Sequence, residues 1–423
     1  MSKKTASLNT IQGRRRIGKS TLIHHFCGLN QVPFFVFQGL PPRPQLSNQH
    51  QLAEFAKTLA KHLGSTQNKF GNWTQAFEGL DLLCSKESRK NKKYLILLDE
   101  ISWMGSKDPD FAAYLKDAWD RLLSQNQNLI LAICGSVSSW IQSNILDNTG
   151  FVGRVSREFY LPELSIAEST SLLRHSLKKI SSHEIAQILA ITGGVPKYLE
   201  EFSPYKSVDT AIHELCYTSS GFFFNELDAI FSDTFGKRNS LYREILTLLT
   251  TGPFTPLELA HKAKHPLNGD WSSHISNLEL AGFIRRDYTW DLKNSPSKSS
   301  QLRLRDNYAK FYLKYIQPQK QRINKLSNAN APHIPINWTT IFGLQFENLI
   351  LNNLTTLVPL PEFRSKRLCK LAPIFNQQPK LEPACKLTVL SSAEKAFYIY
   401  LNSKQERISE RVSKVRCTEN RRF

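Results

Sequence analysis

The chain has 423 residues, of which 41% are hydrophobic, and it carries a formal net charge of +19. At about 150 residues per domain, this length leaves room for two to four domains with filled cores, which excludes an intrinsically disordered chain. No apolar run approaches the roughly 18 residues that span a bilayer, the N-terminus lacks the apolar segment of a signal peptide, and the seven cysteines form no C-x-x-C pair, so we expect a cytoplasmic protein with reduced thiols and no membrane partner.

The first predicted functional element is a phosphate-binding loop. Residues 13–20 read GRRRIGKS and match the pattern G-x-x-x-x-G-K-[ST] at every constrained position. Gly13 and Gly18 let backbone N–H groups turn inward around a triphosphate, and a helix that begins near Lys19 directs its positive end at the anion. Lys19 is expected to neutralise the β and γ phosphates, and Ser20 to offer a hydroxyl to Mg²⁺. The residues predicted to bind ATP here are Gly13, Arg14, Arg15, Arg16, Ile17, Gly18, Lys19, Ser20 and Thr21.

The segments on either side of the loop support this interpretation. Residues 7–12 form a short strand-like run, and residues 20–26 carry apolar side chains at helical spacing. Strand, loop and helix therefore follow in the order that phosphate binding requires. The alternative, a basic glycine turn before an ordinary helix, is much less favoured with these flanks.

A buried strand is predicted over residues 94–98, and it ends in Asp99 and Glu100. The continuous apolar run YLILL is typical of a strand covered on both faces of a parallel sheet. Ligands bind at the carboxyl edge of such sheets, so we expect Asp99 to hold Mg²⁺ through its water shell and Glu100 to orient and deprotonate the attacking water. Two solvated acids that cap the next helix are the alternative.

Two further candidates rest on weaker patterns. A strand over residues 129–133 leads to Ser136, whose hydroxyl could touch the γ phosphate or the attacking water, although a turn with a helix cap is the commoner meaning. Arg154 could reach the γ phosphate in cis or from a neighbouring subunit, although a lone arginine in so basic a chain is more often a solvated charge.

Residues 240–316 predict three helices followed by a hairpin, the order of a winged helix. A capping-box pattern at Thr255 and Glu258 opens the second helix, and the third could enter a DNA major groove while the hairpin touches phosphate. The third helix would carry Ser272, Ser273, His274 and Asn277. Because Glu279 would repel phosphate, a lid or a partner-binding module is as well supported as DNA contact.

Together these segments resemble the archaeal-type P-loop ATPases of the AAA+/STAND group and its MNS-like clade. The resemblance rests on GRRRIGKSTLI, YLILLDEISWM, LILAICGSVSSWI, TGFVGRVSREFYLPEL and ITGGVPKYLEE, and it runs through most of the chain. It implies an α/β fold class, with a P-loop NTPase parallel-sheet core over 1–164, a helical lid over 165–234, a winged helix over 235–317 and a small, degenerate PD-(D/E)xK nuclease-like domain over 318–423.

The resemblance also implies roles for three residues outside the loop. Ser136 corresponds to the first sensor, Arg154 to an arginine finger, and Pro196 to the segment that packs near adenine. A loop followed by a proline in the first turn of a helix is the plain alternative at Pro196.

Both ends depart from the family pattern. Relatives usually carry a further segment before the first strand, whereas here the strand begins almost at Met1. After FGLQFENL at 342–349, the expected Asp and Glu-x-Lys metal site does not follow, so we expect an altered or truncated tail domain without nuclease activity.

The function predicted from these residues is that of an Mg²⁺-dependent switch that binds and hydrolyses ATP. The positive charge favours double-stranded DNA as a partner, since basic surfaces attract nucleic acid through counterion release. A solvated basic surface or a contact with an acidic protein explains the charge equally well. The alternatives are a signalling or scaffold protein whose nucleotide drives self-association without DNA, and a decayed product of a mobile or defence gene.

Overall fold

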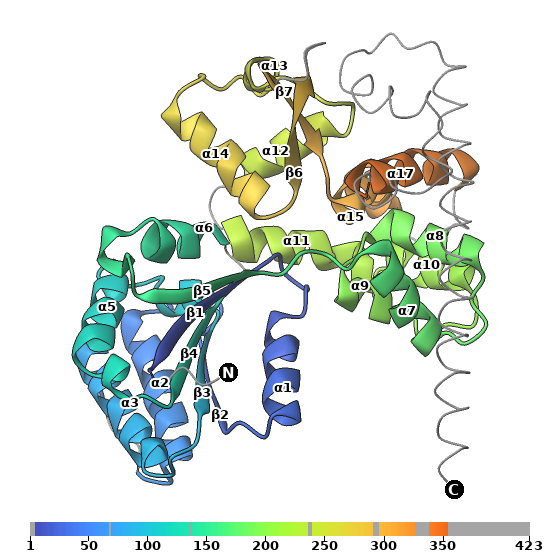
Figure 1. Ribbon diagram of the computed structural model, residues 1–423. Helices are drawn as coiled ribbons and strands as arrows, with labels where there is room; N and C mark the ends of the chain where they lie inside the picture. Colours follow the sequence, from blue (N-terminus) through green and yellow to red (C-terminus); the bar gives the residue numbers. More distant parts are fainter. Residues whose placement is uncertain are drawn as a thin grey trace, which may run out of the picture. The chain divides into compact units, whose positions relative to one another are not determined.

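The computed structural model describes residues 5–66, 69–135, 138–235, 239–290, 296–325 and 338–353 (Figure 1). The chain divides into two compact units, Met1–Pro162 and Glu163–Phe423. This division lies beside the boundary expected between residues 164 and 165. The boundaries expected at 234 and 317 stay predictions, and the tail beyond Asn353 lies outside the described residues.

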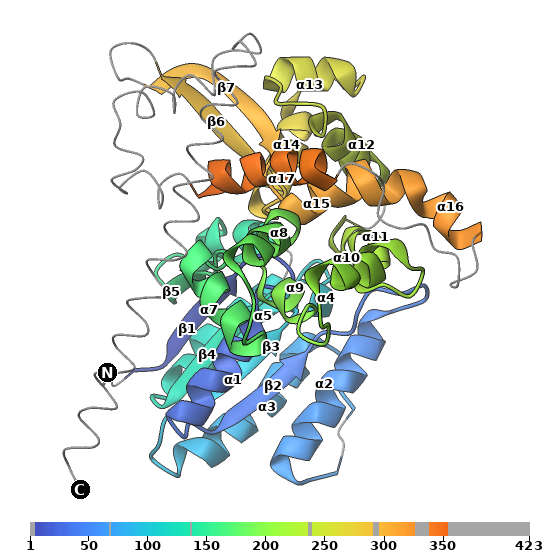
Figure 2. The same ribbon diagram turned by 90° about the vertical axis from the view of Figure 1, so that its right-hand side faces the viewer.

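The first unit is built on a parallel sheet of five strands in the order β2-β3-β4-β1-β5 (Figure 2). Its strands are β1 (Ser7–Gln12), β2 (Phe34–Gln38), β3 (Tyr94–Asp99), β4 (Leu129–Cys134) and β5 (Val155–Tyr160). The three strands that the sequence predicted, β1, β3 and β4, lie side by side at the centre of this sheet. The α/β fold class is therefore confirmed.

Helices cover both faces of the sheet, which explains the long apolar runs of the central strands β3 and β4. They are α1 (Lys19–Leu29), α2 (Asn48–Leu63), α3 (Trp73–Ser88), α4 (Ile101–Met104), α5 (Phe111–Arg121) and α6 (Ser138–Ile141). In β3, Ile96 and Leu98 face the core formed with α2, α3 and α5, whereas Leu95 and Leu97 face the smaller core under α1 (Figure 1). This alternation follows the two-residue period of a strand.

Aromatic rings fill the larger core of the first unit. Trp73 and Phe111 meet edge to face with ring centroids 4.7 Å apart, and Phe55 packs against Trp73 in the same manner at 5.6 Å. All three side chains are almost fully buried. Each such ring removes a large apolar area from water, so this cluster anchors α2, α3 and α5 to the sheet.

The second unit begins with a group of helices that the sequence assigned to a lid. They are α7 (Ile166–Ser176), α8 (Ser182–Thr192), α9 (Pro196–Glu200), α10 (Val208–Tyr217) and α11 (Phe222–Phe235). Capping boxes at Ser165 and Ser181 satisfy the first backbone N–H groups of α7 and α8. The helices enclose a core in which the Tyr308 hydroxyl donates to the Phe223 carbonyl at 2.7 Å.

Three helices and an antiparallel hairpin follow in the predicted order. They are α12 (Asn239–Leu249), α13 (Pro256–Lys262), α14 (Gly269–Leu280), β6 (Ile284–Trp290) and β7 (Pro296–Leu304). The predicted capping box is present, since the Thr255 hydroxyl and the Glu258 carboxylate each accept from the other's backbone N–H. Two of the third-helix residues turn inward, because His274 is buried and Asn277 donates to the Tyr242 hydroxyl.

The described chain closes with α15 (Asn307–Phe311), a π-helical turn (Tyr312–Ile316), α16 (Lys320–Lys325) and α17 (Trp338–Asn352). The amides of Asn307 and Gln345 both donate to the carbonyl of Ala190, at 2.7 and 3.2 Å, which joins α15 and α17 to α8. Helix α17, where the sequence placed the start of a nuclease-like domain, therefore packs into the helical part of the second unit. No helix among the described residues combines the length and hydrophobicity of a membrane span.

Candidate functional site

The predicted phosphate loop lies between β1 and α1, at the carboxyl edge of the sheet. Gly18 caps α1 with a φ of 87°, a left-handed conformation that favours glycine. Gly13 has a φ of 149°, and a Cβ there would lie 2.7 Å from the carbonyl oxygen of Leu161. Both glycines of the pattern are therefore required by the backbone itself.

Lys19 is folded back beneath this loop. Its ammonium donates to the carbonyls of Gly13 at 3.0 Å and Arg14 at 3.1 Å, and the residue is only 7% exposed. Burial lowers the pKa of Lys19, while the negative charges of Glu100 and Asp99 oppose that shift. The Lys19 ammonium is therefore already in place beside the loop, where it can pair with a bound anion.

Ser20 and Asp99 meet beside this lysine. The Ser20 Oγ donates to Asp99 Oδ2 at 2.8 Å, and the backbone N–H of Glu100 donates to Asp99 Oδ1 at 3.0 Å. The Ser20 hydroxyl donates its proton to Asp99 and keeps its lone pairs for a cation, while the Asp99 carboxylate can accept from waters of the ion's shell. The two residues that the sequence predicted at the metal therefore offer the hard-oxygen chemistry that Mg²⁺ prefers, with Asp99 acting through water.

Glu100 occupies a strained turn between β3 and α4. Its φ and ψ are both 49°, a left-handed conformation that costs a non-glycine residue about 1–2 kcal/mol. Gly39, at the end of β2, holds this turn closely: its N–H donates to the Asp99 carbonyl at 2.9 Å, and a Cβ on it would lie 2.6 Å from the Glu100 carbonyl oxygen. Such strain is typical of residues placed for function.

Two residues of this region were missed by the sequence interpretation. Gly39 could have been found as a glycine directly after the apolar run FFVFQ. Cys134 ends β4 and is fully buried, and its burial together with the charge of Asp99 raises its thiol pKa. A neutral thiol therefore lies beside the paired oxygens, where it adds no charge. Ser136, the predicted sensor that follows Cys134, lies outside the described residues.

The other loop residues differ in exposure. Arg14 and Ile17 are buried, whereas Thr21 is exposed on α1. The guanidinium of Arg15 lies 6.0 Å from the ring centroid of Trp103, a cation–π distance, and Arg16 adopts a φ of 69°.

The structure does not bring Arg154 to the phosphate loop of its own chain. Arg154 precedes β5, whose first residue Val155 pairs with Leu8, whereas the loop follows the other end of β1. The two edges are separated by roughly 17 Å, the rise of five strand residues. Arg154 instead forms a bidentate pair with Asp120 on α5, at 2.6 and 2.8 Å. The expected contact in cis is therefore not made, and a role in trans stays a prediction.

Pro196 begins α9 in the second unit. It occupies the first turn after Val195, as proline often does. The preceding Gly194 is fixed by close packing, because a Cβ there would lie 2.0 Å from the Leu164 carbonyl oxygen. This local arrangement accounts for the Gly-Val-Pro segment, and its predicted role at adenine stays a prediction.

Comparison with known proteins finds one protein family and one individual protein that are similar to parts of this chain. Residues 1–202 match the family described as an ATPase domain predominantly from Archaea. An uncharacterized protein of Methanocaldococcus jannaschii is 21% identical over 344 residues, which cover 80% of this chain and 70% of that protein.

Solved structures are similar in fold. The Walker-type ATPase of Pyrococcus abyssi matches with a TM-score of 0.54 at 18% identity, over 73% of this chain and 91% of that one. The ORC2 protein of Aeropyrum pernix, solved as ADPNP–ADP complexes, matches with a TM-score of 0.44 at 15% identity, over 82% and 89% of the two chains. The family match confirms the predicted resemblance to archaeal-type P-loop ATPases over residues 1–202, and the nuclease-like tail stays a prediction.

Proposed function

Starting from an ATPase domain of the archaeal type in residues 1–202, we propose that this chain is an Mg²⁺-dependent switch that binds ATP at residues 13–20 and hydrolyses it. The observation that carries the proposal is the contact of Ser20 with Asp99 beside the buried ammonium of Lys19. Cation, hydroxyl and carboxylate lie together where the first N–H groups of α1 point at an anion.

Phosphate binding uses groups that the loop already holds in place. Lys19 would exchange the carbonyls of Gly13 and Arg14 for the β and γ phosphate oxygens. These bonds gain strength because a charged acceptor replaces a neutral one. The left-handed Gly18 leaves the start of α1 uncapped, since a glycine at this position has no side chain that could bond the first N–H groups in place of a phosphate.

Ser20 and Asp99 are the residues that would hold Mg²⁺. Bound there, the ion would neutralise charge on the phosphate oxygens. The Ser20 hydroxyl would turn its lone pair from solvent toward the ion, and the Asp99 carboxylate would accept from the waters of the ion's shell. Asp99 keeps its orientation through the Glu100 N–H bond to Oδ1.

Glu100 is the proposed general base. Its turn places the carboxylate directly after the residue that holds the metal, at the strand end where the γ phosphate would lie. There it would orient the attacking water and accept its proton. Gly39 supports this role by fixing the turn through backbone contacts.

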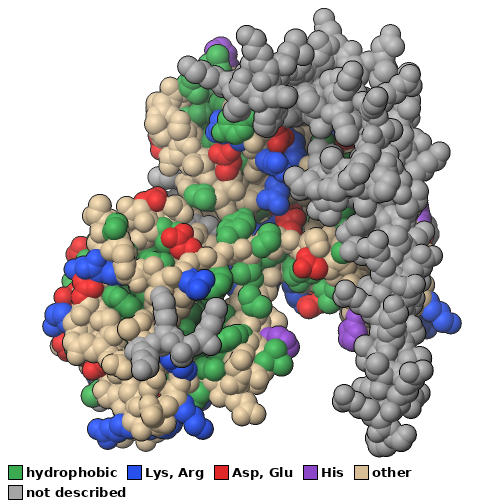
Figure 3. All heavy atoms as spheres, viewed as in Figure 1, with side chains coloured by type: hydrophobic (Ala, Val, Ile, Leu, Met, Phe, Trp, Pro, Cys, Tyr) green, Lys and Arg blue, Asp and Glu red, His purple; other side chains and the backbone are tan. Residues whose placement is uncertain are grey.

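A DNA partner is the second candidate, and the net charge of +19 favours it. Helix α14 would be the recognition helix of a winged-helix element formed by α12, α13, α14 and the β6–β7 hairpin. Two arginines of the hairpin are already paired within this element: Arg286 with Glu279 at 3.2 Å and Arg303 with Asp287 at 2.7 Å. These ion pairs argue against a strong contact of the element with DNA phosphates. On the face of the first unit that Figure 3 shows, basic and acidic side chains are interspersed and form no continuous basic stripe.

The experiment measures ATP turnover of the full chain with and without Mg²⁺, and with duplex DNA over a salt series. Turnover that requires Mg²⁺ supports the ATPase proposal, and its absence at all Mg²⁺ concentrations contradicts it. Stimulation by DNA that falls as salt rises supports the DNA partner. ATP-dependent light scattering without a DNA response supports the scaffold alternative instead.

A further inference from the structure

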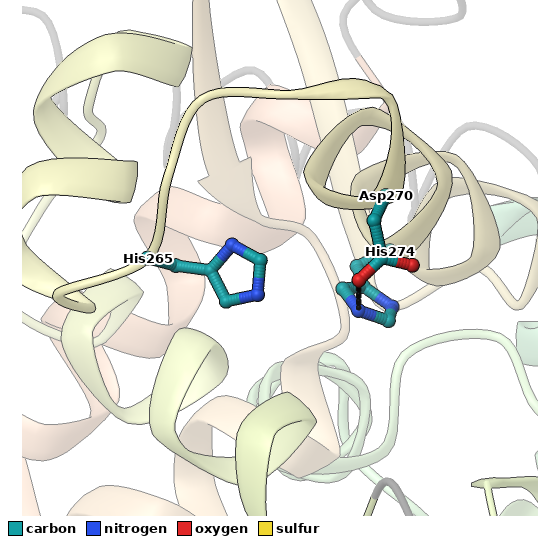
Figure 4. Close-up of side chains that lie close together, drawn as sticks. All are labelled: His265, Asp270 and His274. Carbon is teal, nitrogen blue, oxygen red and sulfur yellow. Dashed lines mark ion pairs between the residues drawn. The ribbon is translucent and has the colours of Figure 1, made fainter.

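Two histidines and one aspartate converge in the second unit. His265 lies in the turn between α13 and α14, while Asp270 and His274 lie one helical turn apart on α14. One ligand atom from each residue lies within 4.8 Å of the others. Figure 4 shows that the His265 ring points toward the Asp270 carboxylate and the His274 ring.

The spacing of two of these groups already suits a tetrahedral ion. His274 Nε2 and Asp270 Oδ2 are 3.2 Å apart. Two ligands of a tetrahedral Zn²⁺ at 2.0–2.2 Å are separated by about 3.3 Å. The third ligand must approach by about 1.5 Å to match the same geometry. His265 is only partly buried and lies in a turn, so a rotation of its side chain can supply this movement.

The remaining ring nitrogens are engaged as metal-binding histidines require. His265 Nδ1 lies 3.1 Å from the carbonyl oxygen of Pro266, which can only accept, so Nδ1 carries the proton and Nε2 keeps its lone pair. His274 Nδ1 lies 3.1 Å from the Tyr242 hydroxyl, and this hydroxyl accepts from the Asn277 amide. Outer contacts of this kind fix the tautomer and orientation of metal-binding imidazoles.

An ion pair between Asp270 and His274 accounts for only part of this arrangement. It gives no reason for His265 to direct a ring nitrogen into the same space, with ring centroids 5.8 Å apart. Packing on Trp271, at 5.2 Å between centroids, holds the His265 ring there. A divalent cation among the three groups would take one lone pair from each of them.

We propose that His265, Asp270 and His274 bind Zn²⁺, with a water as the fourth ligand. Two imidazoles and a carboxylate form a ligand set that suits zinc and excludes Mg²⁺ as a strong competitor, because Mg²⁺ prefers oxygen ligands. The side chain of Asp270 is 58% exposed and that of His274 only 4%, so the ion and its water enter from the Asp270 side.

The bound ion ties the α13–α14 turn to α14. Through the His274 contact with Tyr242, it also fixes α14 against α12. Zinc would therefore stabilise the three-helix element and hold α14 in one orientation. The proposal stands apart from the nucleotide site, and its test does not depend on ATP.

The test titrates Zn²⁺ into the full chain, freed of metal by a chelator, and measures affinity by calorimetry and the unfolding midpoint by thermal denaturation. The variants are His265→Ala and Asp270→Asn, which change side chains that are not deeply buried. His261→Ala, an exposed histidine on α13, is the matched control. Far-ultraviolet circular dichroism without zinc checks that each variant folds.

We expect one zinc ion per chain at this site, bound at least tenfold more weakly by His265→Ala and Asp270→Asn, and unchanged by His261→Ala. Zinc should raise the unfolding midpoint of the native chain and of the control, and have a smaller effect on the two variants. Equal zinc affinity in the native chain and both folded variants would overturn the proposal, as would a native chain that binds no stoichiometric zinc.

Discussion

Ser20 and Asp99 lie 79 positions apart in the sequence and are joined by a hydrogen bond of 2.8 Å between Oγ and Oδ2. Ser20 lies in the first turn of α1, which follows β1, whereas Asp99 ends β3, and β4 lies between these two strands in the sheet. The bond is possible because parallel strands end at a common edge and α1 starts there. It brings a hydroxyl and a carboxylate to the side of the Lys19 ammonium.

Asp99→Asn tests the metal role of this pair. We expect weaker Mg²⁺-dependent ATP binding and turnover, with higher Mg²⁺ concentrations needed for half-maximal activity, because a neutral amide oxygen accepts more weakly than a carboxylate from the waters of the ion's shell. ATP binding measured in excess chelator should change little. An unaltered Mg²⁺ requirement for turnover would argue against a metal role for Asp99. Asp117→Asn, at an exposed position of α5, is a matched control.

Glu100→Gln tests the general base. Turnover should fall by about 10²- to 10⁴-fold, the usual contribution of a positioned base, while ATP affinity is retained. Steady-state phosphate release gives the turnover, and equilibrium binding of a labelled nucleotide gives the affinity. Glu54→Gln, on the surface of α2, should leave both unchanged. Turnover of Glu100→Gln within threefold of the native value would exclude Glu100 as the base.

Gly39→Ala tests the support of the Glu100 turn. The added Cβ would meet backbone atoms at 2.6 and 2.7 Å, so we expect a loss of about 1–3 kcal/mol in unfolding free energy and reduced turnover. Gly28→Ala is the control, since its Cβ meets no atom within 4 Å and a helical alanine is favoured over glycine by about 0.5–1 kcal/mol. Denaturant unfolding of the two variants should give changes of opposite sign.

Arg154→Ala distinguishes a structural role from an arginine finger in trans. Hydrogen bonding from Arg154 is the main reason that the pKa of Asp120 falls to about 2. A lowered carboxyl pKa contributes stability above its ordinary value of 3.8, and that contribution is lost as the pH falls from there toward 2. Since the pair is partly exposed and screened by solvent, we expect only a small loss of unfolding free energy at neutral pH.

Turnover of Arg154→Ala completes this test. A structural role predicts unchanged turnover at every protein concentration. A finger in trans predicts a strong loss of turnover that is partly restored when the variant is mixed with Lys19→Ala chains, which supply the native Arg154.

The central strands and the phosphate site could be predicted because each leaves a local signal. Continuous apolar runs mark β3 and β4, and the loop pattern places Lys19 and Ser20 in one short segment. Asp99 and Glu100 follow from their position after a buried strand. Each of these signals lies within one short segment of the sequence. It can therefore be recognised without knowing which distant segments the segment contacts.

The other features depend on contacts between distant segments. Strand β5 lies at the sheet edge with exposed side chains, so it carries no apolar run, and the place of Arg154 follows only from its register with β1. A glycine is required at position 39 only because the Glu100 turn, about 60 residues later in the chain, packs closely against its backbone. His274 was expected on a helix that could enter a DNA groove, and it is buried because Tyr242 of α12 and His265 of the α13–α14 turn pack against it.

The most direct test of the central claim is the ATP dissociation constant of the full chain in Mg²⁺, compared with those of Lys19→Ala and Lys57→Ala. Loss of the buried Lys19 ammonium should weaken binding by about 10- to 100-fold, the value of charged hydrogen bonds worth about 1.5–3 kcal/mol. The exposed Lys57 should make no difference. Equal affinity of the native chain and a folded Lys19→Ala variant would contradict the account.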